Sequence, residues 1–87
     1  MTKKAYKKKL GVVLSKVDNG FVLIKGNEVF TVNEIGARIF DLCNGQHPVA
    51  IISEKLASVY DLNQLDIESD VRDYLAELIS NDLIKVI

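Results

Sequence analysis

The sequence is poor in the residues that most enzymes use for covalent, acid–base or metal chemistry. It has a single histidine, His47, and a single cysteine, Cys43. One cysteine cannot form an internal disulfide, and the two residues together supply only half of a four-coordinate zinc site. Cys43 falls within a helical apolar pattern, so we expect a buried structural thiol rather than a nucleophile activated by His47. The sequence therefore predicts no catalytic group, no metal and no cofactor.

Long apolar runs and clustered glycines are also missing. No stretch approaches the roughly 18 apolar residues that would cross a bilayer, and no signal-peptide pattern opens the chain. The five glycines are scattered, so no glycine-rich phosphate-binding loop is present. We therefore expect a cytoplasmic protein that does not bind a nucleotide.

Charge is distributed unevenly along the chain. Residues 10–87 carry six positive and twelve negative side chains, a net charge of −6. The first nine residues carry five positive ones, at Lys3, Lys4, Lys7, Lys8 and Lys9. We predict that residues 1–9 form a basic flexible tail and that residues 10–87, in a chain that is 48% hydrophobic, form a single domain.

The first half of this domain has the pattern of three short strands. Apolar and β-branched residues occupy Leu10–Val17, Phe21–Ile24 and Val29–Val32. Tight turns rich in Gly, Asn and Asp separate them. Consecutive strands with short turns form an antiparallel meander, which leaves the first and third strands at the edges.

The second half has the pattern of three helices. Asn33 is a good helix cap, and Ile35, Ile39 and Leu42 recur at helical spacing before Asn44-Gly45 ends the first helix. The others are expected from His47-Pro48 to about Tyr60 and from about Asp66 to Ser80, followed by a short extended tail at Leu83–Ile87. The predicted fold is α+β and winged helix-turn-helix-like: a three-stranded antiparallel sheet followed by three helices.

Such a fold raises the alternative of a small winged-helix DNA-binding regulatory protein. A recognition helix needs Arg or Lys to meet phosphate. From Asp61 to Asp73 the chain instead has five acidic residues and one basic residue, Arg72. The second helix offers only Lys55, beside Glu54. DNA binding is therefore the second hypothesis, and we expect neither a nucleic-acid nor a membrane partner.

The third strand favours a peptide as the partner. An edge strand has a row of unpaired N–H and C=O groups that can accept an extended peptide as a further strand. Val29–Val32 contains no Pro or Lys to prevent such pairing. The third strand joins the first helix at Asn33 without a loop, which fixes the direction of the helices relative to this edge.

Several motifs resemble the PqqD-like family of peptide-recognition elements, which act on ribosomally made precursor peptides. They are the Val32-Asn33 step with Gly36-Ala37 and Ile39, the helix end Leu42-Cys43-Asn44-Gly45, and the helix Asp70-Val71-Arg72-Asp73-Tyr74-Leu75-Ala76-Glu77-Leu78. Their order and spacing match the family over about residues 10–84. The resemblance implies a non-catalytic domain that binds the leader segment of a precursor peptide.

In that family the leader pairs with the third strand and packs on the third helix, and partner enzymes then process it. The resemblance implies peptide-binding residues at Val29, Phe30, Thr31, Val32, Asp70, Val71, Tyr74, Leu75 and Leu78. Core packing is the alternative for the apolar helix residues, because a helical period does not distinguish the two. Gly26-Asn27-Glu28 replaces a Pro-Glu step typical of pyrroloquinoline quinone members. We therefore favour a lasso-peptide type with a leader protease and an ATP-dependent cyclase as partners, with a pyrroloquinoline quinone-type chaperone as the other possibility.

Overall fold

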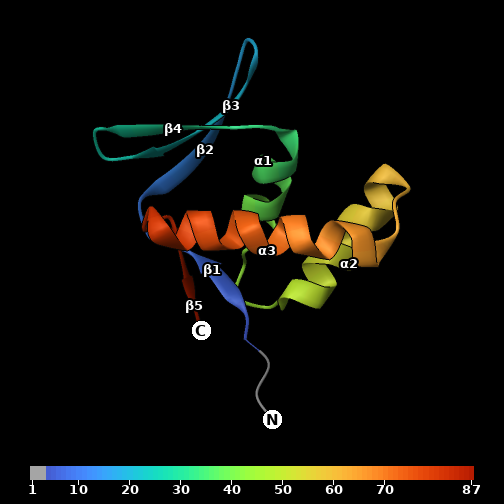
Figure 1. Ribbon diagram of the computed structural model, residues 1–87. Helices are drawn as coiled ribbons and strands as arrows, with labels where there is room; N and C mark the ends of the chain where they lie inside the picture. Colours follow the sequence, from blue (N-terminus) through green and yellow to red (C-terminus); the bar gives the residue numbers. More distant parts are fainter. Residues whose placement is uncertain (1–3) are drawn as a thin grey trace.

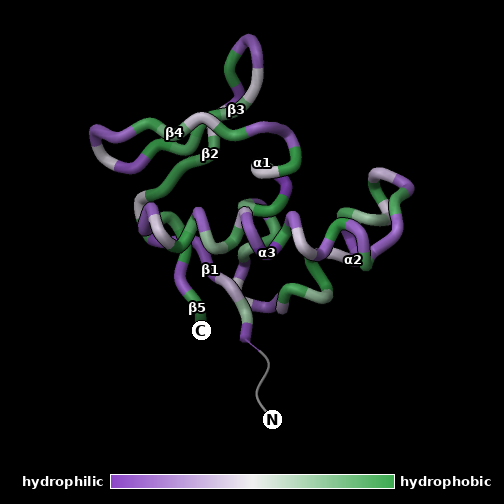
Figure 2. The backbone as a smooth tube through the Cα atoms, viewed as in Figure 1, coloured by the Kyte–Doolittle hydropathy of each residue, from purple (hydrophilic) through white to green (hydrophobic). Residues whose placement is uncertain are grey.

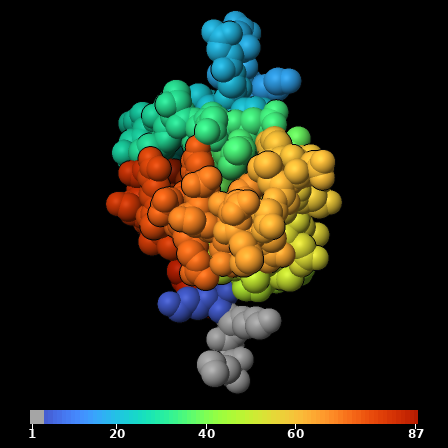
Figure 3. Space-filling model, turned by 45° about the vertical axis from the view of Figure 1, so that its right-hand side comes forward, coloured from blue at the N-terminus to red at the C-terminus, as the bar shows by residue number. Residues whose placement is uncertain are grey.

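Three consecutive strands form an antiparallel sheet in the computed structural model, which describes residues 4–87. They are β2 (Val12–Val17), β3 (Gly20–Lys25) and β4 (Glu28–Val32), in the order β2-β3-β4. The β2–β3 hairpin stands out from the body of the molecule (Figures 1 and 3). The predicted meander is confirmed, and β4 is an edge strand of this sheet.

Three helices follow the sheet, as the sequence predicted: α1 (Glu34–Asp41), α2 (Val49–Tyr60) and α3 (Gln64–Ser80). The Asn33 side chain caps α1 by accepting a hydrogen bond from the Gly36 N–H at 2.8 Å. Asn63 caps α3 in the same way, which starts that helix two residues before the predicted Asp66. No helix among residues 4–87 is long and apolar enough to cross a membrane.

The core lies between the sheet and the three helices. Figure 2 shows hydrophobic and hydrophilic stretches alternating along α3, as expected of a helix with one buried face. The predicted buried thiol is confirmed: Cys43 has no exposed surface, and its Sγ lies 3.2 Å from the Ile39 carbonyl oxygen. The core residues are Leu23, Ile39, Phe40, Cys43, Ile52, Leu56, Ala57, Ile67, Val71, Leu75, Leu78, Leu83 and Ile84.

The two ends of the described chain form a second sheet that the sequence did not predict. Strand β1 (Tyr6–Lys8) pairs antiparallel with β5 (Ile84–Val86), on the other side of α3 from the three-stranded sheet (Figure 1). Further backbone hydrogen bonds join Lys8 to Cys43 and Lys9 to Leu83. The prediction of a flexible tail over residues 1–9 is therefore wrong for the part around β1, while residues 1–3 lie outside the described residues.

The lysines of this segment pack against the domain, which explains why the segment lacks an apolar pattern. The Lys8 ammonium lies 5.4 Å from the centre of the Phe40 ring and 3.7 Å from an Asp41 carboxylate oxygen. Lys9 pairs with Asp82 at 3.0 Å. A lysine can cover apolar surface with its methylene stem while its charge stays at the rim. The strand is thus held by backbone pairing and lysine contacts.

Candidate functional site

The turn before β4 determines which of its backbone N–H and C=O groups point toward β3 and which point outward. Lys25 and Glu28 pair across a two-residue loop, and Gly26 has a φ of +57°, as the first central residue of a primed hairpin turn requires. In such a turn the first residue's carbonyl accepts a hydrogen bond from the N–H of the fourth. The Lys25–Glu28 pair is therefore a hydrogen-bonded pair of the β3–β4 ladder.

From that pair the ladder alternates along β4. Hydrogen-bonded and non-hydrogen-bonded pairs follow one another in an antiparallel sheet. Phe30 and Val32, two and four residues after Glu28, therefore exchange hydrogen bonds with β3. The N–H and C=O groups of Val29 and Thr31 point away from the sheet. The edge of β4 thus presents four backbone groups to a peptide that could align beside it.

The side chains of β4 alternate between the two faces of the sheet. Phe30 and Val32 are half-buried against the core and anchor the strand. Thr31 is exposed on the opposite face, as is Val29, which keeps 62% of its surface accessible. An added strand would therefore meet a fixed backbone, because alternate side chains of β4 are packed beneath it.

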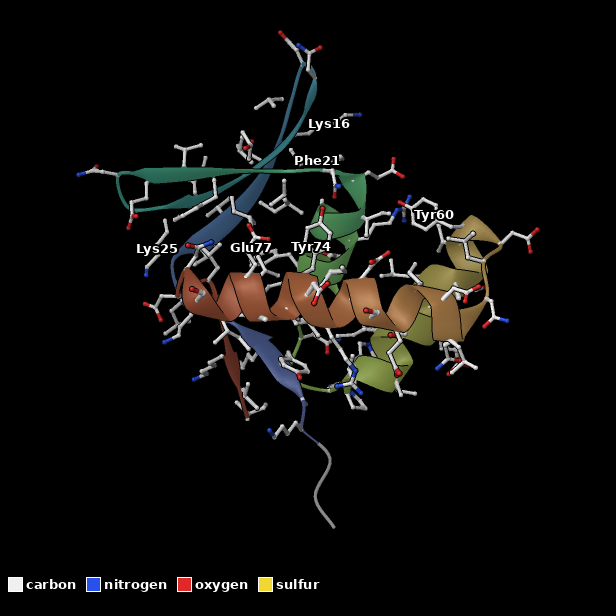
Figure 4. The ribbon with its side chains drawn as sticks, viewed as in Figure 1. Lys16, Phe21, Lys25, Tyr60, Tyr74 and Glu77 are labelled. Atoms are coloured by element: carbon white, nitrogen blue, oxygen red, sulfur yellow. The ribbon has the colours of Figure 1, made fainter. Side chains whose placement is uncertain are left out.

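A groove of about 410 Å³ runs between β4 and α3. Figure 3 shows the two elements next to each other on the surface. Figure 4 shows Tyr74 and Glu77 pointing from α3 toward the sheet. The groove is lined by Val29, Phe30, Thr31, Val32, Asn33, Tyr74, Glu77, Leu78, Asn81 and Leu83.

The structure shows which of the predicted α3 residues lie in the core and which line the groove. Val71 and Leu75 have exposed fractions of 0% and 2% and belong to the core. Tyr74 is half-buried and lines the groove, and so does Leu78, although only 3% of its surface is exposed. Asp70 is exposed one turn before Tyr74 and does not line the groove. Of the predicted α3 residues, Tyr74 and Leu78 therefore line the groove.

Four lining residues were missed by the sequence analysis: Asn33, Glu77, Asn81 and Leu83. A signal for two of them was present. Glu77 and Asn81 follow Tyr74 by three and seven residues, so all three lie on one side of the helix. Both are polar, so they do not belong to the apolar pattern from which most of the α3 contacts were predicted. Asn33 was assigned a capping role and a place at the strand–helix junction, and Leu83 a place in the C-terminal segment.

The junction between β4 and α1 closes one end of the groove. Gly36 lies in the first turn of α1, directly against the ring of Tyr74. A Cβ at position 36 would lie 2.8 Å from the Tyr74 Cε1 atom. The glycine therefore provides the space in which Tyr74 packs beside Val32. The absence of a loop at Asn33 keeps this contact next to the end of β4.

A larger hollow of about 570 Å³ lies between β2, β3, α1 and α2. Its rim contains an ion pair between Arg38 and Glu34, whose nearest side-chain atoms are 3.8 Å apart. Glu34 also accepts a 2.6 Å hydrogen bond from Tyr60, and desolvation followed by this bond raises the pKa of Tyr60. We favour the groove between β4 and α3 as the site. The edge strand beside the larger hollow is β2, which carries Lys16, and a lysine on an edge strand disfavours pairing with a further strand; Val29–Val32 contains no lysine.

Away from the groove, the thiol of Cys43 is buried in the core. Burial raises the pKa of the Cys43 thiol to about 12, which the nearby Lys8 charge only partly offsets. The thiol is therefore protonated at neutral pH and is a poor nucleophile. Among residues 4–87 no group of three His, Cys, Asp or Glu side chains is placed to hold a metal ion.

Comparison with known proteins places this fold in a family. The family model for coenzyme PQQ synthesis protein D, PqqD, matches residues 12–84. The chain belongs to the PqqD family. It is 36% identical over 67 residues to a PqqA binding protein of Methylococcus capsulatus (strain Bath), a match that covers 77% of this chain and 70% of that protein.

Three solved structures have the same fold. The PqqD truncation of Methylobacterium extorquens PqqCD, a stand-alone recognition element for ribosomally synthesized and post-translationally modified peptides, superposes with a TM-score of 0.80 at 24% identity, covering 92% of this chain and 87% of that one. Lasso peptide synthetase B1 complexed with its leader peptide gives 0.76 at 23% identity, covering 92% and 96%. TbiB1 in complex with the TbiA(β) leader peptide gives 0.75 at 25% identity, covering 91% and 94%.

Proposed function

We propose that this PqqD-family chain is a non-catalytic recognition element that binds the leader segment of a ribosomally synthesised precursor peptide. The leader adds as a strand to β4 and packs its side chains against α3. The observation that carries this proposal is the open edge of β4, whose outward backbone groups at Val29 and Thr31 adjoin a groove whose lining includes Tyr74 and Leu78. The relative named for binding PqqA and the two solved complexes with leader peptides support it.

Recognition in this groove separates into two contributions. Backbone hydrogen bonds to Val29 and Thr31 require only that the leader be extended. Side chains on alternate leader positions face the groove, where Tyr74 and Leu78 provide apolar contact. Phe30 and Val32 hold the strand in place from the core side. Asp70, Val71 and Leu75 take no direct part in this arrangement.

For the type of pathway we favour lasso-peptide biosynthesis in the cytoplasm, with a leader protease and an ATP-dependent cyclase as partners. The loop Gly26-Asn27-Glu28 lacks a Pro-Glu step, and two structural neighbours are complexes with leader peptides, one of them a lasso peptide synthetase. A role as a pyrroloquinoline quinone-type chaperone is the second candidate. The 36% identity to a PqqA binding protein favours it.

Titration of the purified chain with fluorescently labelled leaders tests the function and separates the two types. One peptide is the leader of a lasso precursor encoded beside this gene, and the other is a PqqA-type precursor. Saturable binding of only one peptide assigns the type, and binding of neither contradicts the proposal. The mass of each peptide should stay unchanged with and without ATP, since the chain alone is proposed to catalyse nothing.

The DNA-binding alternative is disfavoured by the surface of α3. Its exposed residues include Asp66, Asp70, Asp73 and Glu77, which would meet phosphate with repulsion. Binding to duplex DNA that weakens steeply with salt, in the absence of leader binding, would reverse this preference.

A further inference from the structure

The β4–α3 groove has one charged residue in its lining. Among the described residues that form it, Glu77 alone carries a charge, and the others are apolar, aromatic or neutral polar. Glu77 lies one helical turn after Tyr74, and in Figure 4 both side chains point from α3 toward the sheet. Since Tyr74 packs at the Gly36 end, Glu77 lies farther along the groove, away from the junction.

The nearby cations are engaged elsewhere. The Lys25 ammonium lies 2.7 Å from Asp82, and Lys9 lies 3.0 Å from the same carboxylate. These two contacts, Lys25 first, lower the pKa of Asp82 to about 2, so this carboxylate stays ionised at neutral pH and holds both lysines. Within residues 4–87 the Glu77 carboxylate is in no ion pair and no side-chain hydrogen bond.

A peptide strand in this groove would remove water from the Glu77 carboxylate. Desolvating a charge without supplying a partner opposes binding, and a like charge opposes it further. A cationic side chain on the peptide reverses both effects, and a guanidinium can form two hydrogen bonds to one carboxylate. The exposed Asp73, one turn earlier on α3, adds to the negative potential at the same place.

We infer that Glu77 selects leaders that carry a Lys or Arg on the groove-facing side of the added strand. The inference rests on the proposed function and adds the chemistry of the ligand. Side chains of an extended peptide alternate between its two sides, so this basic residue is two positions away from an apolar residue that contacts Tyr74. A leader with Asp or Glu at that position is rejected.

Selection from a displayed library of random 15-residue peptides tests this even when the natural leader is unidentified. The baits are the parent chain, Glu77→Lys and a matched control, Glu54→Lys, which makes the same charge change at an exposed position on α2. The parent and Glu54→Lys should enrich peptides with a Lys or Arg two positions from apolar residues. Glu77→Lys should enrich Asp or Glu at that same position.

The outcomes distinguish the inference from the function on which it rests. If all three baits enrich the same extended apolar peptides with no preferred charge, the role of Glu77 is refuted and leader binding stays intact. If no peptide is enriched by the parent chain, the proposed function falls and the inference falls with it. Thermal melts of each bait establish that it is folded, and Glu77→Gln replaces Glu77→Lys if the latter does not fold.

Affinity measurements on one enriched peptide complete the test. Glu77→Gln should weaken its binding roughly 3- to 10-fold, and changing the peptide's basic residue to Gln should cause a similar loss. The two changes together should cost little more than either alone. The parent's advantage should shrink when NaCl is raised from about 0.05 to 0.5 M. Additive losses that ignore salt would contradict an ion pair.

Discussion

Replacing Thr31 by proline removes an outward N–H of β4 and leaves the sheet's own ladder intact. Thr31 forms a non-hydrogen-bonded pair with Val22, so its N–H is available to a docked strand. Proline is tolerated on an edge strand when the missing N–H faces outward. We therefore expect the variant to fold, with its melting temperature only a few degrees below the parent's.

The effect on leader binding should be much larger than the effect on stability. One backbone hydrogen bond contributes about 0.5–1.5 kcal/mol, and the proline ring also occupies the space that the added strand would take. Together these should weaken leader affinity about tenfold or more, since about 1.4 kcal/mol corresponds to a factor of ten. The assay is anisotropy titration with the labelled leader, alongside thermal melts. Thr31→Val keeps the N–H and should bind nearly as well as the parent.

The opposite edge of the sheet provides a matched control. Val17 and Gly20 pair across a two-residue loop, so by the same alternation Lys16 has its N–H directed outward from β2. Lys16→Pro makes an equivalent change there and should leave leader binding unaltered. If folded Thr31→Pro binds as tightly as the parent, or Lys16→Pro loses as much affinity, β4 is not the docking edge.

The same strand offers an inward-facing comparison. Phe30 pairs with Leu23 through the ladder, so Phe30→Pro leaves a buried Leu23 group without its partner and also removes a half-buried ring. An unsatisfied buried group costs about 1–3 kcal/mol. Phe30→Pro should therefore melt well below Phe30→Ala, which loses the ring alone. Equal melting of these two variants would mean that the alternation along β4 is assigned incorrectly.

Three further predictions follow from contacts around the groove. Deletion of residues 1–9 removes β1 with its pairing to β5, and should lower the free energy of unfolding by roughly 2–4 kcal/mol in denaturant titrations, whereas a flexible tail would leave it unchanged. Gly36→Ala should displace the Tyr74 ring and weaken leader binding about 3- to 10-fold. The free energy of unfolding should change by less than about 1 kcal/mol, because Ala favours the helix. In a Tyr74→Ala background, Gly36→Ala should cause no further loss of leader affinity. Asp82→Asn should melt at a lower temperature than the parent at pH 7. The two melting temperatures should converge as the pH falls from 4 toward 2, because the Asp82 carboxylate, whose pKa is lowered to about 2 in the folded state, becomes protonated there and no longer stabilises the fold.

Local signals in the sequence were enough for most of the fold. The turn residues around Gly26, the cap at Asn33 and the helical spacing of apolar residues each depend on near neighbours in the chain. The β1–β5 sheet has no such signal. It pairs Tyr6 with Val86 across nearly the whole chain through backbone groups, which every residue has. A segment of five lysines within nine residues therefore has the pattern of a flexible tail, although part of it is a strand.

The candidate site shows a different limit. The edge of β4 was predictable because three short strands in a row must leave the third one unpaired on one side. The residues of α3 that line the groove were predictable only in part, since helical spacing brings Val71, Tyr74 and Leu75 to nearly the same face. Which of them faces the core depends on where the sheet sits above the helix. Glu77 was not predicted because the α3 contacts were predicted mainly from apolar residues. Its spacing of three residues from Tyr74, which puts both on one side of the helix, is present in the sequence.

The two walls of the groove should control different properties of binding. An edge strand accepts any extended peptide through its backbone, so β4 by itself selects little. Selection has to come from α3, where Tyr74 sets shape and Glu77 sets charge. Two contacts, one beyond each end of β4, hold α3 beside this strand. Gly36 packs against Tyr74 after the strand, and Lys25, before the β3–β4 turn, pairs with Asp82 just after α3. Changes in the backbone of β4 should therefore decide whether any leader binds, while changes on α3 should decide which leader binds.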